Sequence, residues 1–247
     1  VVAITGGGQG LGRSMAVYLA DKGVKLALID LDPAKLNETI QLCEKAGSHA
    51  KAYICNVAKE DDVIPTFEAI TSDFGKIDGL VNNIGGASEL KCLEEITYED
   101  WDQTHNFNLK STFMLCKHVI PVMKKQHYGR VVNVSSLAGR RASHFGGIQY
   151  ASAKAGLLGL TRQLAWEVGG FGITVNSVVP GPVLTNRVQK KWDALSSQQQ
   201  SQVLANISLN RLPQPIEVAN AIVFLISDDA SYISGVSLDV NGGSYMI

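Results

Sequence analysis

Excess charge of either sign is absent from this chain. Its 22 lysines and arginines are balanced by 23 aspartates and glutamates, so the net charge is -1. Proteins that bind nucleic acids or anionic membrane surfaces use a strong positive field, which this balance does not supply. The composition therefore predicts no nucleic-acid partner.

Paired cysteines and long apolar runs are absent as well. The four cysteines (Cys43, Cys55, Cys92 and Cys116) form no C-x-x-C pair, so we expect buried, reduced thiols and no metal site. No apolar run approaches the roughly 18 residues of a membrane span, and no charged and then apolar leader opens the chain. We expect a cytoplasmic protein without a membrane segment. Because the first residue is Val1 rather than methionine, we also expect a few N-terminal residues to be missing from this numbering.

Apolar runs alternate with helical patterns along the 247 residues. The predicted strands are Val1–Thr5, Lys25–Asp30, Ala50–Cys55, Gly79–Asn82, Gly129–Ser136, Gly172–Val179 and Val236–Val240. The predicted helices run to Gly23, from Asp32 to about Ala46, over Lys59–Phe74, from Thr97 to about Lys125, from Tyr150 through Trp166, and over Ile216–Ser227. Strict alternation predicts an α/β fold with a doubly wound parallel sheet and helices on both faces. We expect one domain over residues 1–247, although length alone would also allow two.

A glycine cluster lies between the first strand and the first helix. Gly6, Gly10 and Gly12 would let the backbone approach a pyrophosphate, and the next helix would offer free N–H groups. Their spacing is G-x-x-x-G-x-G rather than G-x-G-x-x-G, and tight turns also need glycine for structural reasons alone.

Asp30 ends the second strand, eighteen residues beyond Gly12. A carboxylate there suits the two hydroxyls of an adenosine ribose and would repel a 2′-phosphate, which favours NAD over NADP. Neither Leu31 nor Gln9 offers a cation in compensation. The alternative is that Asp30 caps a loop, but Asp32 and Pro33 already supply a helix start.

Parallel strands bring their carboxyl ends to one edge, where ligands bind. Asn56 follows the third strand, and Asn82, Asn83 and Gly85 follow the fourth. These residues are either ordinary turn residues or groups that contact an adenine and brace the cofactor loop.

Tyr150 and Lys154 lie four residues apart, so on a helix they share one face. A nearby ammonium lowers the pKa of a phenol from its usual value near ~10, which would let Tyr150 exchange a proton with a carbonyl or carbinol oxygen. The same spacing also occurs by chance in many helices.

Two further polar groups accompany this pair. Ser136, at the end of the fifth strand, could hydrogen-bond a substrate oxygen or be an ordinary loop serine. No G-x-S-x-G elbow surrounds it, so a hydrolase nucleophile is not indicated. Asn108 lies within an apolar helix, where it is either a satisfied core amide or a group that braces the backbone or relays protons.

Residues 184–212 are polar and irregular, as expected of a mobile substrate lid at the ligand edge. The helices that carry Asn108 and Tyr150 show more apolar surface than one sheet face can cover, which predicts helix pairing between subunits.

The motifs resemble those of the short-chain dehydrogenases/reductases over essentially the whole chain. They are Thr5-Gly6-x-x-x-Gly10-x-Gly12, Asn82-Asn83-Ile84-Gly85, Asn108, Ser136, Tyr150-x-x-x-Lys154 and Pro180-Gly181. The resemblance implies a Rossmann-like domain that moves hydride between NAD(P) and a secondary alcohol or ketone, in a homotetramer. Tyr150 would be the acid/base, Ser136 would orient the substrate oxygen, and Lys154 would lower the Tyr150 pKa and hold the nicotinamide ribose. Asn108 would hold a relay water, and Thr185 would contact the nicotinamide carboxamide. The full cofactor set that the resemblance implies is Gly6, Gly10, Leu11, Gly12, Asp30, Asn56, Val57, Asn83, Gly85, Tyr150, Lys154, Pro180, Gly181, Val183 and Thr185.

Departures from the family pattern bear on the subgroup. Ile84 replaces a common alanine, and Asn56 replaces a common aspartate. The chain most resembles the 3-oxoacyl-acyl-carrier-protein reductases, which generally use NADPH, whereas Asp30 opposes NADPH. Phe171 replaces an arginine with which those reductases often dock the acidic carrier.

Three functions therefore stand side by side. The first is an NAD-dependent dehydrogenase of a small hydroxyl or carbonyl compound, and the second is the carrier-protein reductase. The third is a dinucleotide-binding sensor without turnover, against which the intact set of Asn108, Ser136, Tyr150 and Lys154 argues.

Overall fold

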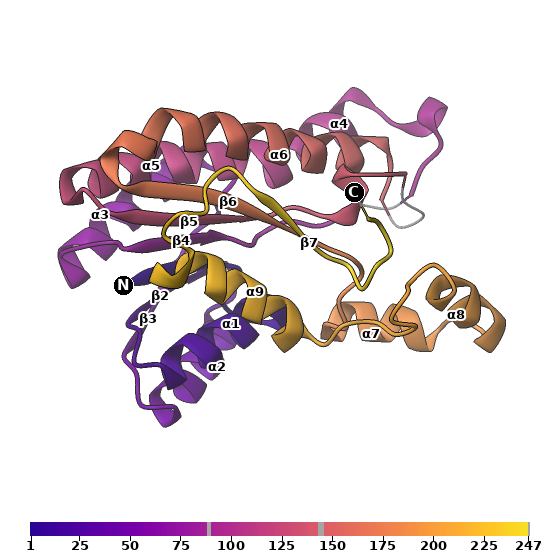
Figure 1. The fold of residues 1–247 in the computed structure, drawn as a ribbon, viewed down its shortest axis with the longest axis horizontal. Coiled ribbons are helices and arrows are strands. Elements are labelled where there is room, and N and C mark those ends of the chain that lie inside the picture. The colour runs from indigo at the N-terminus through magenta and orange to yellow at the C-terminus, as the bar shows by residue number, and fades with distance from the viewer. Residues whose placement is uncertain (88–89, 143–145, 247) are drawn as a thin grey trace.

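Seven parallel strands form the sheet of the computed structural model, which describes residues 1–87, 90–142 and 146–246 (Figure 1). The strands are β1 (Val2–Thr5), β2 (Leu26–Asp30), β3 (Ala50–Ile54), β4 (Gly79–Asn82), β5 (Gly129–Val134), β6 (Ile173–Pro180) and β7 (Ser237–Val240). Their order in the sheet is β3-β2-β1-β4-β5-β6-β7, and every pairing is parallel. The order reverses beside β1, which is where a ligand crevice forms in open α/β sheets.

Helices cover both faces of the sheet (Figure 1). One face carries α1 (Gly10–Asp21), α2 (Pro33–Lys45) and α9 (Pro215–Ile226), and the other carries α3 (Glu60–Phe74), α5 (Ser111–Gln126) and α6 (Ile148–Val168). Helix α4 (Tyr98–His105) packs beside α6 on the second face. The predicted doubly wound parallel sheet is confirmed.

Two apolar cores follow from the alternation of side chains along the strands. In β1, Ile4 belongs to the core under α1, α2 and α9, whereas Ala3 belongs to the core under α3, α5 and α6. Leu28 and Ile29 of β2 divide in the same way. Because both faces are buried, these strands are apolar throughout rather than alternating with polar residues.

The helix predicted from Thr97 to about Lys125 is interrupted in the structure. A π-helical segment, Asn106–Lys110, joins α4 to α5, and it contains Asn108. Its neighbour Leu109 packs against α6 where Gly156 lies, and a Cβ on that glycine would lie only 2.8 Å from Leu109 Cδ2. Wider turns of this kind are rare and frequently occur at functional sites.

Residues 184–212 are more regular than predicted. They contain two short helices, α7 (Asn186–Asp193) and α8 (Ser197–Leu204), which project beyond the sheet (Figure 1). Thr185 caps α7 by accepting from Val188 N, and Ser196 forms a capping box with Gln199 at the start of α8. This capping satisfies first-turn N–H groups, which helps a polar stretch to form helices.

Smaller predictions are corrected as well. Strand β5 ends at Val134, so Ser135 and Ser136 follow the strand rather than end it, and β6 continues through Pro180. Cys92 is exposed, unlike the other three cysteines, because it precedes a short surface turn. Residues 143–145, which come between β5 and α6 in the sequence, lie outside the described residues.

Among residues 1–87, 90–142 and 146–246, no helix is long and apolar enough to cross a membrane. The same residues contain no group of three or more His, Cys, Asp or Glu side chains arranged to hold a metal ion.

Candidate active site

The glycine loop between β1 and α1 has no room for side chains at its key positions. A Cβ on Gly12 would lie 2.0 Å from the carbonyl oxygen of Gly6, so the helix could not begin where it does. Gly6 and Gly10 have φ values of 67° and 55°, in the left-handed region that favours glycine. The turn therefore depends on the three glycines that the sequence singled out.

The first turn of α1 presents its N–H groups to the edge of the sheet. Gln9 is the N-cap, and among the described residues no side chain accepts a hydrogen bond in that turn. A helix N-terminus with free N–H groups and a glycine approach suits the negative oxygens of a diphosphate. The loop of Gly6, Gly10, Leu11 and Gly12 thus fits the diphosphate of a dinucleotide.

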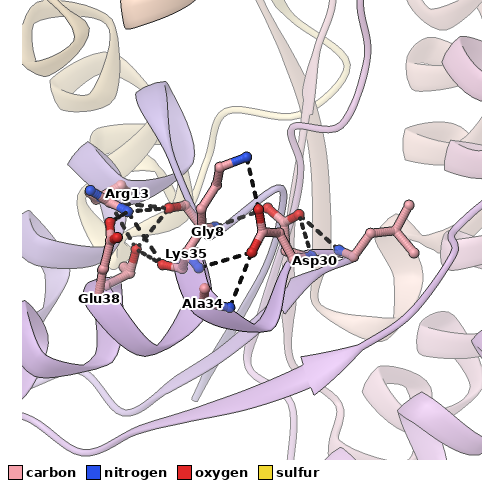
Figure 2. Close-up of polar contacts among 9 residues, drawn as sticks. Gly8, Arg13, Asp30, Ala34, Lys35 and Glu38 are labelled. Carbon is pink, nitrogen blue, oxygen red and sulfur yellow. Dashed lines mark hydrogen bonds and ion pairs between the residues drawn. The ribbon is translucent and has the colours of Figure 1, made fainter.

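Asp30 ends β2 with both carboxylate oxygens bonded to the main chain (Figure 2). Its Oδ2 accepts from Gly8 N at 3.0 Å, and its Oδ1 accepts from Leu31 N at 2.8 Å. Asp30 therefore ties the glycine loop to β2 and also forms the turn after the strand. Both the loop role and the proposed ribose role are compatible with this position.

Leu31 and Gln9 offer no cation to Asp30, as the sequence shows, but two cations from other positions lie near it in the structure. The first cation is Lys35, in the first turn of α2. Its hydrogen bond with Asp32 is the main cause that raises the pKa of Lys35, and the negative charge of Asp30 adds to the rise. Its Nζ pairs with Asp32 Oδ2 at 2.9 Å, and Arg13 pairs with Glu38 at 2.7 Å while donating to Gly8 O (Figure 2). Sequence neighbours could not reveal these cations, because α1 and α2 bring them to the site from other turns.

The asparagines at the sheet edge brace the backbone. Asn83 Nδ2 donates to Thr5 O at 2.9 Å, and a Cβ on Gly6 would lie 2.9 Å from the same nitrogen. Asn82 lies inside β4, buried, and donates to Asn133 Oδ1 at 2.8 Å. Asn56 Oδ1 accepts from Ala58 N at 3.1 Å, which makes a turn before α3. Bracing and turn roles thus apply to these residues.

Ser136, Tyr150 and Lys154 are brought together by β5 and α6. The side chains of Ser136 and Tyr150 are hydrogen-bonded, and the Lys154 Nζ lies 5.8 Å from the centre of the Tyr150 ring. Lys154 is buried, with 3% of its surface exposed, and its Nζ donates to Val134 O at 2.9 Å. A Cβ on Gly146 would lie 2.4 Å from Tyr150 Cδ1, so the absence of a side chain there admits the ring.

The predicted lowering of the Tyr150 pKa is wrong for this structure. Burial raises the pKa of the phenol, and the hydrogen bond with Ser136 and the charge of Arg187 only partly oppose it. Burial also lowers the pKa of Lys154 to about 8. Desolvation disfavours the charged form of both groups, so it moves the two pKa values in opposite directions.

Asn108 is buried and fully bonded. Its Oδ1 accepts from Gly86 N at 2.9 Å, and its Nδ2 donates to Gly86 O at 3.1 Å and to Thr104 O at 3.0 Å. A Cβ on Gly85 would lie 2.7 Å from Lys154 Nζ and 2.9 Å from Asn108 Oδ1. Of the predicted alternatives, the structure shows the bracing role: Asn108 fixes the glycines that adjoin Lys154.

The remaining predicted residues lie along the same edge. Val57 and Val183 are buried near the ends of β3 and β6, and Leu11 is buried at the start of α1. Pro180 ends β6, and Gly181 N approaches Val240 O at 3.4 Å. Thr185 lies over the glycine loop, since a Cβ on Gly10 would be 3.2 Å from its Cγ2.

Sequence reasoning missed two polar residues at this site. Ser135 is buried, and its Oγ donates to Lys154 O at 2.8 Å, which anchors α6 to the end of β5. Arg187, in α7, reaches Gly86 and acts electrostatically on Tyr150. The first could have been suspected from the paired serines, but the second depends on the path of residues 184–212.

Two cavities are present elsewhere. One, of about 340 Å³, is lined by residues that include Leu209, Arg211, Asn241 and Tyr245, and the other, of about 410 Å³, by residues that include Leu184, Trp192 and Leu204. Neither is lined by Ser136, Tyr150 or Lys154.

Fold and site together define a nicotinamide-dinucleotide oxidoreductase. A family model described as enoyl-(acyl carrier protein) reductase matches residues 6–245. The 3-oxoacyl-[acyl-carrier-protein] reductase of Vibrio cholerae serotype O1 is 37% identical, over 100% of this chain and 98% of that protein. The chain belongs to the short-chain dehydrogenase/reductase family.

Solved structures agree with this assignment. Levodione reductase superposes with a TM-score of 0.93 at 33% identity, covering 98% of this chain and 96% of its own. A 3-oxoacyl-[acyl-carrier protein] reductase from Brucella melitensis with bound NAD superposes with a TM-score of 0.89 at 28% identity, covering 100% and 91%. The predicted family and reaction class are thereby confirmed.

Proposed function

We propose that the protein is an NAD-dependent dehydrogenase/reductase of a secondary alcohol or ketone. The observation that carries the proposal is the hydrogen-bonded pair of Ser136 and Tyr150, with Lys154 buried beside the phenol ring. These groups follow β5, on the same edge as the glycine loop. The site residues are assigned on this basis.

The dinucleotide supplies the hydride acceptor or donor, and the side chains of this chain manage the proton. Tyr150 Oη gives a proton to the carbonyl oxygen in reduction and takes it from the hydroxyl in oxidation. Ser136 Oγ holds that oxygen next to the phenol. Lys154 returns a proton to the phenol or takes one from it, and it would also hold the nicotinamide ribose; its Nζ donates to Val134 O. Asn108 keeps the wall of Gly85 and Gly86 in place.

NAD is proposed over NADP because of Asp30. A 2′-phosphate would be repelled by its carboxylate because both are negatively charged. The loss of binding free energy for NADP would be a few times about 1.4 kcal/mol, and each 1.4 kcal/mol is about tenfold in affinity. Lys35 weakens this discrimination, but its Nζ is held by Asp32. The Brucella melitensis reductase, which is similar in fold, carries NAD.

A reductase of carrier-bound 3-oxoacyl thioesters is the second candidate. The 37% identity to the Vibrio cholerae enzyme favours it. Phe171 argues against it, because it lies at the position where the resembling reductases often have an arginine that docks the acidic carrier, and Lys124 Nζ lies 4.4 Å above its ring instead. Comparison of kcat/KM for a free and a carrier-linked 3-oxoacyl thioester separates the two candidates.

The lid, the single domain, the cytoplasmic location and the tetramer remain proposals. Residues 184–212 project at the ligand edge, as a lid requires (Figure 1). Phe107, Phe113 and Trp166, from the π-helical segment, α5 and α6, are 41%, 53% and 86% exposed, which favours subunit pairing through these helices. Sedimentation at micromolar concentration should show an oligomer, and a pure monomer would contradict this proposal.

The decisive experiment replaces Tyr150 by phenylalanine. Wild-type enzyme is first screened with NAD against secondary alcohols, sugars and hydroxyacyl thioesters. Tyr150→Phe should then lower kcat at least about 10²- to 10⁴-fold, because general acid–base catalysis is lost, while the Kd of NADH stays within about twofold. Near-normal activity of this variant on the true substrate would refute the catalytic assignment.

A further inference from the structure

An arginine from residues 184–212 lies beside Gly86, next to the proposed catalytic residues. Arg187 is the second residue of α7, and a Cβ on Gly86 would lie 3.0 Å from its Nη1 and 3.2 Å from its Nη2. The same Gly86 is held by Asn108 through both its N–H and its C=O. The guanidinium therefore lies next to Gly86, and the preceding residue, Gly85, adjoins Lys154.

The guanidinium has no anionic partner in the part of the chain that the structure describes. No ion pair and no hydrogen bond of the Arg187 side chain occurs among residues 1–87, 90–142 and 146–246. By contrast, Arg13, Arg130, Arg140 and Arg211 all pair with carboxylates. An arginine that has no counter-ion and lies beside Gly86 can bind an anion from solution.

Two further observations support a role toward substrate. The positive charge of Arg187 opposes the rise of the Tyr150 pKa, which places the guanidinium within electrostatic reach of the phenol. Residues 184–212 also carry four cations, Arg187, Lys190, Lys191 and Arg211, against the single acid Asp193, in a chain of net charge -1. The positive charge is thus concentrated on the segment proposed as the lid.

We propose that Arg187 recognises an anionic group of the substrate, so that the enzyme acts on a secondary hydroxy acid or the corresponding oxo acid. This inference rests on the proposed function and adds the substrate class to it. The hydroxyl or carbonyl would lie at Tyr150 and Ser136, and the carboxylate would lie toward α7. A guanidinium offers two parallel N–H donors to a carboxylate or a phosphate, so a phosphorylated hydroxy compound shares this chemistry.

The cofactor is the other source of anionic oxygens near this position. Thr185, two residues before Arg187, lies over Gly10 of the diphosphate loop. An arginine that bound the cofactor diphosphate would affect every substrate equally and would raise the Kd of NADH. The experiment must therefore separate the substrate anion from the cofactor diphosphate.

The test uses acids whose hydroxyl lies at carbon 2, 3 or 4, each paired with its methyl ester. Arg187→Met removes the charge, Arg187→Lys keeps it, and Lys190→Met removes a matched charge from the same helix. We expect Arg187→Met to lower kcat/KM for the best acid about 10- to 100-fold and for its ester less than threefold. Arg187→Lys should recover part of the loss, and Lys190→Met should leave both rates unchanged.

A binding measurement keeps this inference separate from the proposed function. Calorimetry of the same acids and esters with the enzyme–NADH complex should show weaker acid binding in Arg187→Met than in wild type, with no change for esters. If no compound is turned over, the proposed function fails while the binding result still decides the role of Arg187. Equal losses for acid and ester, no acid binding to wild type, or a raised Kd of NADH in Arg187→Met would each overturn the proposal.

Discussion

The two adjacent serines should separate stability from catalysis when each is replaced by alanine. Ser135 is 3% exposed and donates to Lys154 O at 2.8 Å. Ser136 is less buried, accepts from Ala138 N at 3.2 Å, and is hydrogen-bonded to Tyr150. One hydroxyl therefore anchors α6, whereas the other belongs to the proposed proton-transfer site.

The expected magnitudes follow from these contacts. Loss of the Ser135 hydrogen bond should lower the free energy of unfolding by about 0.5–1.5 kcal/mol, which for a chain of this size lowers Tm by roughly 1–6 °C. Loss of the Ser136 hydroxyl removes a hydrogen bond to an oxygen that carries charge during reaction. Such bonds are worth about 1.5–3 kcal/mol, so kcat/KM should fall about 10- to 100-fold.

Thermal melting and initial rates of NAD reduction measure the two effects on the same preparations. We expect Ser135→Ala to have a lower Tm and near-normal kcat/KM, and Ser136→Ala to have a Tm within about 1 °C of wild type and a low kcat/KM. Full activity in Ser136→Ala would refute its role toward the substrate oxygen. A large loss of activity in Ser135→Ala without a change in Tm would show that the roles are exchanged.

Two further predictions concern charge at the site. Asp30→Ala combined with Leu31→Arg should shift the cofactor preference, measured as kcat/KM for NAD divided by kcat/KM for NADP, by at least about tenfold toward NADP. Comparable kcat/KM values for the two cofactors in the wild-type enzyme would contradict the role of Asp30. The rate of alcohol oxidation should rise with pH and level off above about 8, because burial lowers the Lys154 pKa to about 8 and the coupled Lys154–Tyr150 pair then loses its first proton. Lys154→Met should move that midpoint upward, since burial raises the pKa of the phenol that remains, and a pH profile unchanged by this variant would exclude the pair.

Much of the fold could be predicted from the sequence because the strands are buried on both faces. Runs such as Leu26–Asp30 are apolar throughout, and Asp32 and Pro33 mark the next helix start by simple capping chemistry. The glycine turn was also predictable, because a Cβ at Gly12 would overlap the carbonyl oxygen of Gly6. In these places the local preference and the tertiary structure agree.

The rest depends on contacts between distant segments. The π-helical turn at Asn108 has no local signal, because its side chain is satisfied by Gly86, which lies 22 residues earlier. Arg13 and Glu38 are 25 residues apart in the sequence and meet only when α1 and α2 lie side by side. Arg187 comes from a segment whose helices begin at the side-chain caps Thr185 and Ser196, and its place beside Gly86 depends on the path of that whole segment. Sequence patterns identify such residues poorly, since periodicity describes one element at a time.

The protonation of the Tyr150–Lys154 pair determines how readily the proposed site donates or accepts a proton at neutral pH. Lysine next to tyrosine suggested a phenol that ionises easily, whereas burial raises the pKa of Tyr150 and lowers that of Lys154 to about 8. At pH 7 the phenol is therefore protonated and the lysine is mostly charged, which is the state that a carbonyl reduction needs, because the carbonyl oxygen must receive a proton. Alcohol oxidation needs a base, and the pair supplies one only after its first proton is lost near pH 8. The positive charge of Arg187 works against the effect of burial on the phenol, so a bound substrate anion that neutralised Arg187 would keep Tyr150 in its protonated, proton-donating form.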